Sequence, residues 1–451
     1  MFRRILVANR GEIAARILRA CRAMDIRTVA VHSTADAGSP HLKLADATVC
    51  IGPAPAARSY LDMNAILQAA EQTECQAVHP GYGFLSENAL FAARCAEQHL
   101  TFIGPPPRLI RLMGDKIEAR RTMRAASVPT IPGSDGALPD AGAAARAAAE
   151  VGYPVFLKAA AGGGGKGMRR CEDEASLQRA FDEASAEAAA AFGNGALYLE
   201  KAIVGGRHIE MQILCDAWGA GVHLGERECS VQRHHQKLLE ESPSVAMPAR
   251  QREKLGAQVA ATLAGLGYRN AGTVEFLRDR DGQFYFMEMN TRLQVEHPVT
   301  EAVTGLDLVQ LQIRIAANER LPMTQQAVRL TGHAIECRIN AEDPDQGFRP
   351  SPGRIDGLQL AAGARFDTHI EAGFCVTPHY DSLLGKLIVH AGDRAAAIAS
   401  MEKALGEMRI DGVKTTLPLH RRLMQEPAFR SGDYDVELMD RMLAGAGRGA
   451  P

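Results

Sequence analysis

The chain has 451 residues, of which 46% are hydrophobic and 23% charged, and its formal net charge is −2 at pH 7. This near-neutral charge, the single Trp and the aromatic content of 5% argue against nucleic acid or a membrane surface as a partner and favour a small polar ligand. Nine scattered Cys without a Cys-x-x-Cys pair argue against a disulfide framework and indicate a cytoplasmic protein, whose length suits two or three packed regions.

Alternating strands and helices open the chain. An apolar strand pattern at 5–8, a helical pattern at 12–24 and a second strand at 28–31 predict a β-α-β unit in a parallel sheet. The apolar run at the start is too short for a signal peptide, and no run in the chain approaches membrane-spanning length. The first turn lacks Gly-x-Gly-x-x-Gly, so no dinucleotide site is predicted there.

A turn-rich loop at 80–88 follows a predicted strand. In an open α/β sheet, ligands bind at such strand ends. The same residues are equally consistent with a plain connection in which Ser86 caps the next helix. Both interpretations stay open at this point.

A second region begins near residue 131 with an Ala-rich helical pattern at 137–149. A strand ending in Lys158 then leads into four glycines at 162–165, which Lys166 follows. This is not a Walker A loop, because Lys166 precedes Gly rather than Ser or Thr. A flexible linker is one interpretation, but flanking basic residues favour a mobile lid over phosphates. A strand at 197–203 returns the chain to the main body.

The third region begins with a strand that places His208, Glu210 and Gln212 on one face by alternation. Further along, the adjacent His234 and His235 are expected on opposite faces of a strand, without other ligands at zinc spacing. Zinc is therefore disfavoured. We expect this polar strand to bring Gln232, His235 and Lys237 to a phosphate or a ribose.

A predicted hairpin forms the centre of the sequence. Strands at 272–277 and 284–290 flank an Asp-Gly pair at 281–282, which is typical of a two-residue turn. Counting outward from that turn places Arg278 opposite Tyr285 and Glu275 opposite Glu288.

Strict alternation along the second strand places Phe284, Phe286, Glu288 and Asn290 on one face. Two solvated glutamates would be one outcome of this register. However, Glu275 and Glu288 have apolar sequence neighbours, so their repulsion calls for a cation between them, and Mg²⁺ suits oxygen ligands best.

Polar side chains continue beyond this hairpin. Arg292, Gln294 and Glu296 alternate, and they supply a cation, an amide and a carboxylate, which suggests an anion site beside a base. A strand from 333 places Arg338 on a face with Glu336. For Arg338, a buried salt bridge and stabilisation of an oxyanion both stay open. Helices are expected at 306–317 and 394–407, and a disordered tail from residue 444.

Six segments together closely resemble biotin carboxylase, the ATP-grasp component of biotin-dependent carboxylases: 9–14, 79–88, 162–169, 227–237, 288–298 and 336–343. The resemblance covers the chain from residue 1 to about residue 440. It implies a mixed α/β and α+β ATP-grasp fold with a Rossmann-like N-terminal domain (1–115), a linker (116–130), a lid (131–203), a C-terminal domain (204–446) and a short tail (447–451).

The resemblance also implies a reaction in which ATP and bicarbonate form carboxyphosphate and the carboxyl group passes to N1′ of biotin. Glu296 would deprotonate bicarbonate, and Arg338 would stabilise the enolate-like oxygen of biotin. The anion and biotin would be bound by Lys237, Arg292, Gln294, Val295, Glu296 and Arg338. Two Mg²⁺ or Mn²⁺ ions would be held by Glu275, Glu288 and Asn290. ATP would be bound by Lys116, Lys158, Gly163, Gly164, Gly165, Lys166, Glu200, Lys201, Ile203, His208, Gln232, His235, Glu275 and Glu288.

The chain departs from the family pattern at His234, where Arg is usual, and at Ala161, which shortens the glycine run. It contains no Met-Lys-Met attachment sequence, so biotin is expected on a separate carrier protein. A homodimer working with carrier and carboxyltransferase subunits is implied. Acetyl-CoA or another acyl-CoA is the expected acceptor, with pyruvate as an alternative. Another carboxylate-amine ligase and a catalytically silent subunit are the competing hypotheses.

Overall fold

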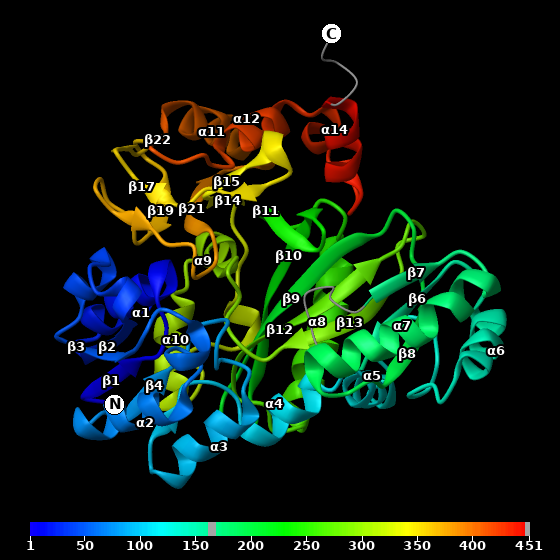
Figure 1. The fold of residues 1–451 in the computed structure, drawn as a ribbon, viewed down its shortest axis with the longest axis horizontal. Coiled ribbons are helices and arrows are strands. Elements are labelled where there is room, and N and C mark those ends of the chain that lie inside the picture. The colour runs from blue at the N-terminus through cyan, green and yellow to red at the C-terminus, as the bar shows by residue number, and fades with distance from the viewer. Residues whose placement is uncertain (161–167, 447–451) are drawn as a thin grey trace.

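The computed structural model describes residues 1–160 and 168–446. Figure 1 shows the N-terminal part of the chain at the lower left, the lid at the right and the C-terminal helices along the top. The predicted glycine run and residues 447–451 lie outside the described residues. Helix α14 (Leu438–Ala446) continues to Ala446, so the expectation of a disordered tail from residue 444 is wrong for its first three residues.

A parallel sheet forms the N-terminal region, with strand order β3-β2-β1-β4-β5. Its strands are β1 (Arg4–Val7), β2 (Arg27–Ser33), β3 (Ala47–Gly52), β4 (Ala77–His79) and β5 (Thr101–Phe102). Helix α1 (Gly11–Ala23) packs on one face, and α2 (Met63–Gln72) and α3 (Ala89–Glu97) pack on the other. The predicted parallel β-α-β opening is confirmed.

An antiparallel sheet of eight strands runs through the middle of the molecule in the order β13-β12-β9-β10-β11-β14-β21-β19 (Figure 1). The strands are β9 (Arg207–Cys215), β10 (Gly221–Arg233), β11 (Gln236–Ser242), β12 (Asn270–Arg278), β13 (Phe284–Asn290), β14 (His333–Asn340), β19 (Arg365–Thr368) and β21 (Leu383–Ala391). One face of the β13 end is covered by α4 (Pro107–Gly114), α5 (Lys116–Ala125) and α8 (Ala249–Gly265). The opposite face is left for polar side chains.

Helices α11 (Arg394–Glu407) and α12 (Leu417–Gln425) cover the other end of this sheet in a separate apolar core. The remaining helices of the C-terminal half are α9 (His297–Thr304), α10 (Leu308–Ala316) and α13 (Pro427–Ser431). Three short strand pairs complete it: β15 (Glu342–Asp343) with β16 (Arg349–Pro350), β17 (Gly353–Arg354) with β20 (Cys375–Val376), and β18 (Gly357–Gln359) with β22 (Arg409–Asp411). Among the described helices, none has the length and apolar character needed to cross a bilayer.

The lid consists of a small antiparallel sheet, β7-β6-β8, with two helices packed on it. Its strands are β6 (Val155–Ala159), β7 (Met168–Cys171) and β8 (Leu197–Lys201), and its helices are α6 (Ala141–Val151) and α7 (Glu174–Phe192). Helix α6 begins four residues later than the sequence pattern suggested, because the Asp140 side chain accepts a hydrogen bond from the Ala143 N–H and caps it. The strand expected to reach 203 ends at Lys201.

The central hairpin has the predicted glutamate pair but a different turn. Glu275 is opposite Glu288, as predicted. Near the turn, however, Arg278 is opposite Phe284 rather than Tyr285, and a bulge between these two pairs shifts the register by one residue. The extra residue is Met287.

This bulge also changes the faces of β13. Phe284, Phe286 and Met289 all belong to the apolar core beneath α8, so Phe284 and Phe286 do not share a face with Glu288 and Asn290 as strict alternation suggested. The bulge is what moves the carboxylate to the polar side of the sheet.

One further local expectation is wrong, and one detail of an interpretation that was left open differs. His234 and His235 have φ of +47° and +64° and form the turn between β10 and β11, so they do not lie on opposite faces of a strand. The helix after the 80–88 loop is capped by Asn88, whose Oδ1 accepts the Phe91 N–H at 2.8 Å, and not by Ser86. At 234–235 the turn overrides the expected alternation, whereas at the helix Asn88 is as good an N-cap residue as Ser86 and lies directly before the first turn.

Candidate active site

The polar face of the central sheet follows from alternation along β9. Ile209, Met211 and Ile213 are buried in the core beneath α8. His208, Glu210 and Gln212 take the other positions and are also buried, as the sequence predicted for a shared polar face. Buried polar groups require partners, and neighbouring strands supply them.

Lys237 on β11 joins three carboxylates from three parts of the chain. Its Nζ donates to Glu210 at 2.6 Å, to Glu275 at 3.0 Å and to Glu296 at 2.6 Å. Burial lowers the pKa of Lys237, but the three carboxylates raise it well above its ordinary value. The ammonium group is therefore a permanent positive charge at the centre of this cluster.

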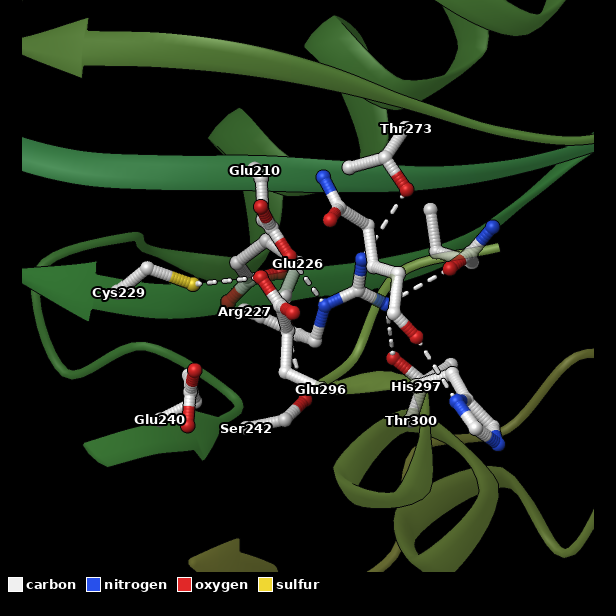
Figure 2. A network of polar contacts seen from close by, with 12 residues as sticks. Glu210, Glu226, Arg227, Cys229, Glu240, Ser242, Thr273, Glu296, His297 and Thr300 are labelled. Atoms are coloured by element: carbon white, nitrogen blue, oxygen red, sulfur yellow. Dashed lines mark hydrogen bonds and ion pairs between the residues drawn. The ribbon is translucent and has the colours of Figure 1, made fainter. Parts of the chain in front are cut away.

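Arg227 forms the second cationic centre, and its side chain is completely buried. It pairs with Glu210 and donates to Gln212 Oε1 at 2.7 Å, Thr300 Oγ1 at 2.9 Å and Thr273 Oγ1 at 3.1 Å (Figure 2). The sequence reasoning assigned no role to Arg227 or Glu210. Counting outward from the turn between β9 and β10 would have placed Glu226 opposite Glu210. A bulge between His223 and Glu226 shifts the register by one residue and places Arg227 there, so no direct signal for this pair was present in the sequence.

Glu296 lies between Lys237 and Arg338. One carboxylate oxygen accepts from Lys237, and the other accepts from Arg338 Nη2 at 2.9 Å. Burial would raise the pKa of Glu296, but Lys237 and Arg338 lower it well below its ordinary value. Arg338 also donates from Nε to Glu240 at 2.7 Å, so the buried salt bridge considered for Arg338 is present.

Arg292 is held at the edge of this cluster by a residue that the sequence reasoning missed. Its Nε donates to Glu87 Oε2 at 2.9 Å, and Nη1 and Nη2 donate to the side-chain oxygens of Gln294 and Asn290, each at 2.9 Å. Glu87 lies in the 80–88 loop, and it also accepts the Thr291 N–H at 2.9 Å. The loop therefore contacts the site, as its position after β4 allowed.

The glutamates of the hairpin have different cationic neighbours. Glu275 accepts from Lys237, Asn290 Nδ2 at 2.9 Å and Gln294 Nε2 at 3.1 Å, whereas Glu288 lies 3.4 Å from Lys116 Nζ. Burial would raise the pKa of Glu275, but Lys237 and His208 hold it well below its ordinary value.

Within the described residues, two groups bring potential metal-ligand atoms within 4.8 Å of one another: His208 with Glu210 and Glu275, and Glu210 with Cys229 and Glu296. Glu288 belongs to neither group, and the trio of Glu275, Glu288 and Asn290 stays a prediction. Asn290 directs its amide nitrogen at Glu275 and its oxygen at Arg292.

Three of the residues predicted for the rest of the nucleotide site lie on strands of the lid: Lys158 on β6, and Glu200 and Lys201 on β8. Lys158 pairs with Glu200 at 2.5 Å, and Arg120 lies 3.2 Å from the same carboxylate. Lys201 donates to the backbone oxygens of Gly152 and Tyr153, each at 2.8 Å.

The other predicted nucleotide contacts differ in their exposure. Gln232 is buried beside His208, with 3.4 Å between Nε2 and Nδ1. His235 is exposed and Ile203 is half-buried. The predicted contacts Gly163, Gly164, Gly165 and Lys166 lie outside the described residues.

Three family models match the chain in succession: the biotin carboxylase N-terminal domain at residues 1–110, the carbamoyl-phosphate synthase L chain ATP-binding domain at 115–324 and the biotin carboxylase C-terminal domain at 336–441. A biotin carboxylase from Nostoc sp. is 54% identical over 443 residues, covering 98% of this chain and 99% of the relative.

Solved structures agree with these matches. A biotin carboxylase from Campylobacter jejuni, described as a β,γ-ATP complex, is 48% identical with a TM-score of 0.96, covering 98% of this chain and 99% of that one. The biotin carboxylase domain dimer of Hydrogenobacter thermophilus 2-oxoglutarate carboxylase, in complex with MgADP, ADP and bicarbonate, is 48% identical with a TM-score of 0.95, covering 98% of each chain. The predicted ATP-grasp fold and enzyme class are thereby confirmed, and this chain belongs to the biotin carboxylase family.

Proposed function

We propose that this chain carboxylates N1′ of biotin on a separate carrier protein, using ATP and bicarbonate, and that carboxyphosphate is the intermediate. The observation that supports this most directly is the position of Glu296. A single buried carboxylate contacts both Lys237 and Arg338, and Arg292 lies close by with Gln294. Cations beside a carboxylate can bind an anion within hydrogen-bond reach of that carboxylate, which is the geometry that a general base needs.

For the nucleotide, Lys116, Lys158 and His208 would contact phosphates and ribose, and Glu200, Lys201 and Ile203 the adenine, with Gln232 and His235 nearby. Glu275 and Glu288 offer hard oxygen ligands to Mg²⁺ or Mn²⁺, and Asn290 would join them if its amide turned over. A bound ion there would neutralise charge on the transferring phosphoryl group. Lys237 and Lys116 are the positive charges beside these glutamates in the structure.

Bicarbonate would lie against Arg292, Gln294 and the backbone of Val295, with Lys237 nearby. Lys237 and Arg338 lower the pKa of Glu296, so its carboxylate is ionised at neutral pH. Bicarbonate that drew these two cations toward itself would raise that pKa and make Glu296 the stronger base that the proton transfer needs. The resulting dianion is a nucleophile for the γ-phosphoryl group of ATP. Loss of that proton is the step that Glu296 supplies.

Carboxyphosphate would then release CO₂ and phosphate, and the phosphate would remove the ureido proton of biotin. Arg338 would stabilise the enolate-like oxygen that develops. Its Nε is held by Glu240, and its Nη2 by Glu296, so the guanidinium is fixed in direction before the charge appears. Such preorganisation is what makes a hydrogen-bond donor effective in a transition state.

For the assembly, we infer a homodimer that works in the cytoplasm with carrier and carboxyltransferase subunits. Support comes from the dimer of the Hydrogenobacter relative and from nine free cysteines in the described chain, which suit a reducing compartment. Acetyl-CoA or another acyl-CoA is the proposed acceptor. A keto acid such as pyruvate is the alternative, since that relative is part of a 2-oxoglutarate carboxylase.

The test is ATP hydrolysis by the purified chain with Mg²⁺, measured with and without bicarbonate and free biotin. We expect hydrolysis to require bicarbonate and to rise with biotin. Glu296→Ala should lower the rate by about 100- to 10,000-fold, the range for loss of a general base. The matched control is Glu97→Ala, which removes an exposed carboxylate at the end of α3 and should leave the rate unchanged.

A rate of ATP hydrolysis that neither bicarbonate nor biotin changes would overturn the proposal in favour of a carboxylate-amine ligase. Absence of any hydrolysis by a folded, nucleotide-binding chain would favour the silent-subunit hypothesis. The acceptor is tested separately, by adding the carrier and carboxyltransferase proteins of the same organism and following labelled bicarbonate into acyl-CoA, pyruvate or 2-oxoglutarate.

A further inference from the structure

Lys386 is a buried charge outside the set of residues described so far. It lies on β21, and its side chain has no exposed surface. Its Nζ donates to the backbone oxygen of Val295 at 2.8 Å and lies 3.3 Å from Glu12 Oε1. The contact joins the C-terminal half of the sheet, the first helix of the chain and the segment between β13 and α9.

Among residues 1–160 and 168–446, the backbone carbonyl of Val295 is the one hydrogen-bond partner of Lys386. Asp367 of β19 is directly opposite Lys386, and although burial would raise its pKa, Arg365 and Lys386 lower it, so this ionised carboxylate balances the ammonium. No carboxylate oxygen of Glu12 or Glu336 accepts a hydrogen bond within the same residues. Burial raises the pKa of Glu12 to about 7 and that of Glu336 well above its ordinary value, while Lys386 opposes both changes. A buried ammonium is costly to maintain, so its single directed contact calls for an explanation.

His297 makes the matching contact one peptide earlier. Its Nδ1 is 2.8 Å from the backbone oxygen of Gln294. Burial keeps the pKa of His297 well below its ordinary value, so the ring is neutral, and a carbonyl partner requires that Nδ1 carries the hydrogen. Two successive carbonyls, of Gln294 and Val295, are therefore held by buried donors.

The consequence follows from peptide geometry. In a trans peptide the N–H points opposite to the C=O of the same unit. Fixing these two carbonyls therefore fixes the N–H directions of Val295 and Glu296, which point away from His297 and Lys386. The side chains of Gln294 and Glu296 meanwhile contact Glu275, Lys237 and Arg338.

We propose that Lys386 is a positioning residue for the bicarbonate step, which orients the Val295–Glu296 backbone through the Val295 carbonyl and is itself held by Glu12 of α1. The inference rests on the proposed function, because it assigns Lys386 to the same anion site. It also gives a role to the motif at 9–14, because Glu12 in that motif anchors this ammonium. A charged donor makes a stronger hydrogen bond to a carbonyl than a neutral donor does, which suits a residue that must fix a backbone direction.

The test is the kinetics of Lys386→Met, a variant of similar length without the charge. We expect kcat/KM for bicarbonate to fall about 100-fold, the effect of misplacing a reacting group by about 1 Å, while the KM for ATP changes less than about twofold. Lys43→Met is the matched control, because Lys43 also joins the N-terminal region to the C-terminal half through Glu371, at 2.6 Å on the exposed surface. It should leave both parameters unchanged.

Equal losses for ATP and bicarbonate, or no loss for bicarbonate, would overturn the assignment of Lys386. If circular dichroism shows that Lys386→Met is unfolded, the same kinetics are measured for Glu12→Gln, which retains the lysine and removes the carboxylate beside it. A loss of about 10-fold confined to bicarbonate supports the proposal, and an unchanged kcat/KM for bicarbonate overturns it. Wild-type protein without bicarbonate-dependent hydrolysis would instead contradict the proposed function, so the two failures are distinct.

Discussion

The polar face of the central sheet and the outer surface of the lid use charged residues in opposite ways. On the polar face of the sheet, Lys237, Arg227 and Arg338 pair with carboxylates that have no exposed side-chain surface or almost none. In the lid, Arg169 pairs with Glu187 and Arg170 with Glu172, and each of these four side chains is at least 41% exposed. Most of the lid interior is apolar, with Ala144, Leu157 and Leu199 fully buried. The Lys158–Glu200 pair between β6 and β8 is an exception, with side chains 12% and 1% exposed.

Exposed and buried ion pairs differ in how much movement they tolerate. Water can replace the partner of an exposed ion pair, so a movement that separates such a pair leaves no charge unpaired. A buried pair has no such replacement, and removing one member leaves the other as an uncompensated charge. The buried ion pairs of the site are therefore fixed on the sheet, whereas the ion pairs on the outer surface of the lid are screened by solvent.

The largest effect is expected for Arg227→Met. The substitution leaves Glu210 beside Lys237 only and removes the hydrogen-bond donors to Gln212, Thr273 and Thr300. Breaking a buried ion pair costs about 3–5 kcal/mol, so the free energy of unfolding should fall by that amount in a urea titration. A loss below about 1 kcal/mol would show that Glu210 takes up a proton and that the network tolerates a missing cation.

The second effect is a pH dependence centred on Glu241 of β11. Burial would raise the pKa of Glu241, but His333 and Arg394 lower it to about 2 from 4.5. His333 Nε2 and Arg394 Nε each lie 2.7 Å from its Oε2. Because the folded carboxyl loses its proton more easily than the unfolded one, the stabilisation is complete above about pH 4.5 and is lost as the pH falls toward 2. The two pKa values correspond to about 3 kcal/mol.

Glu241→Gln should therefore reduce the free energy of unfolding by about 3 kcal/mol at pH 7, and the gap from wild type should narrow as the pH falls below about 4.5. The pKa values of Glu12 and Glu240 are raised to about 7, so their contribution to the free energy of unfolding falls as the pH rises. This contribution is the same in wild type and variant and cancels when the two free energies are subtracted. Urea titrations between pH 7 and pH 3 measure the gap. A gap that is the same at every pH would contradict the ionised carboxylate as its source.

The sequence predicted the polar positions of this site better than the geometry that connects them. Alternation placed His208, Glu210 and Gln212 on one face because β9 is regular throughout its length. The same rule failed on β13, where the bulge at Met287 reverses the faces of Phe284 and Phe286. Glu275 was nevertheless correctly predicted opposite Glu288. Near the turn the observed pairing differs from the predicted one by one residue, and the bulge shifts the pairing back by one residue before Glu275.

Other features depended on contacts between distant parts of the chain. Glu87 reaches Arg292, and Glu12 reaches Lys386, across separations of 205 and 374 positions in the numbering. No local pattern reports such pairs. Periodicity predicts faces within an element, and capping residues mark its ends, as for the helix at 394–407, whose predicted bounds are confirmed. The partner of a buried charge is decided by tertiary packing.

The smallest effect is expected in the lid. Arg169→Ala removes a pair in which Nη2 of Arg169 lies 2.6 and 2.8 Å from the two Glu187 oxygens, with side chains 41% and 54% exposed. Exposed ion pairs contribute about 0.2–1 kcal/mol and are screened by salt. Hydrogen exchange of the amides in β6 and β8 should report a loss within that range at low ionic strength and almost none in about 1 M salt. The loss in Arg227→Met should not change with salt, because its ion pair is buried. If both variants lost the same free energy, or if salt weakened both, charge in the lid would have the same structural role as charge on the sheet, and the lid would have to break strong pairs in order to move.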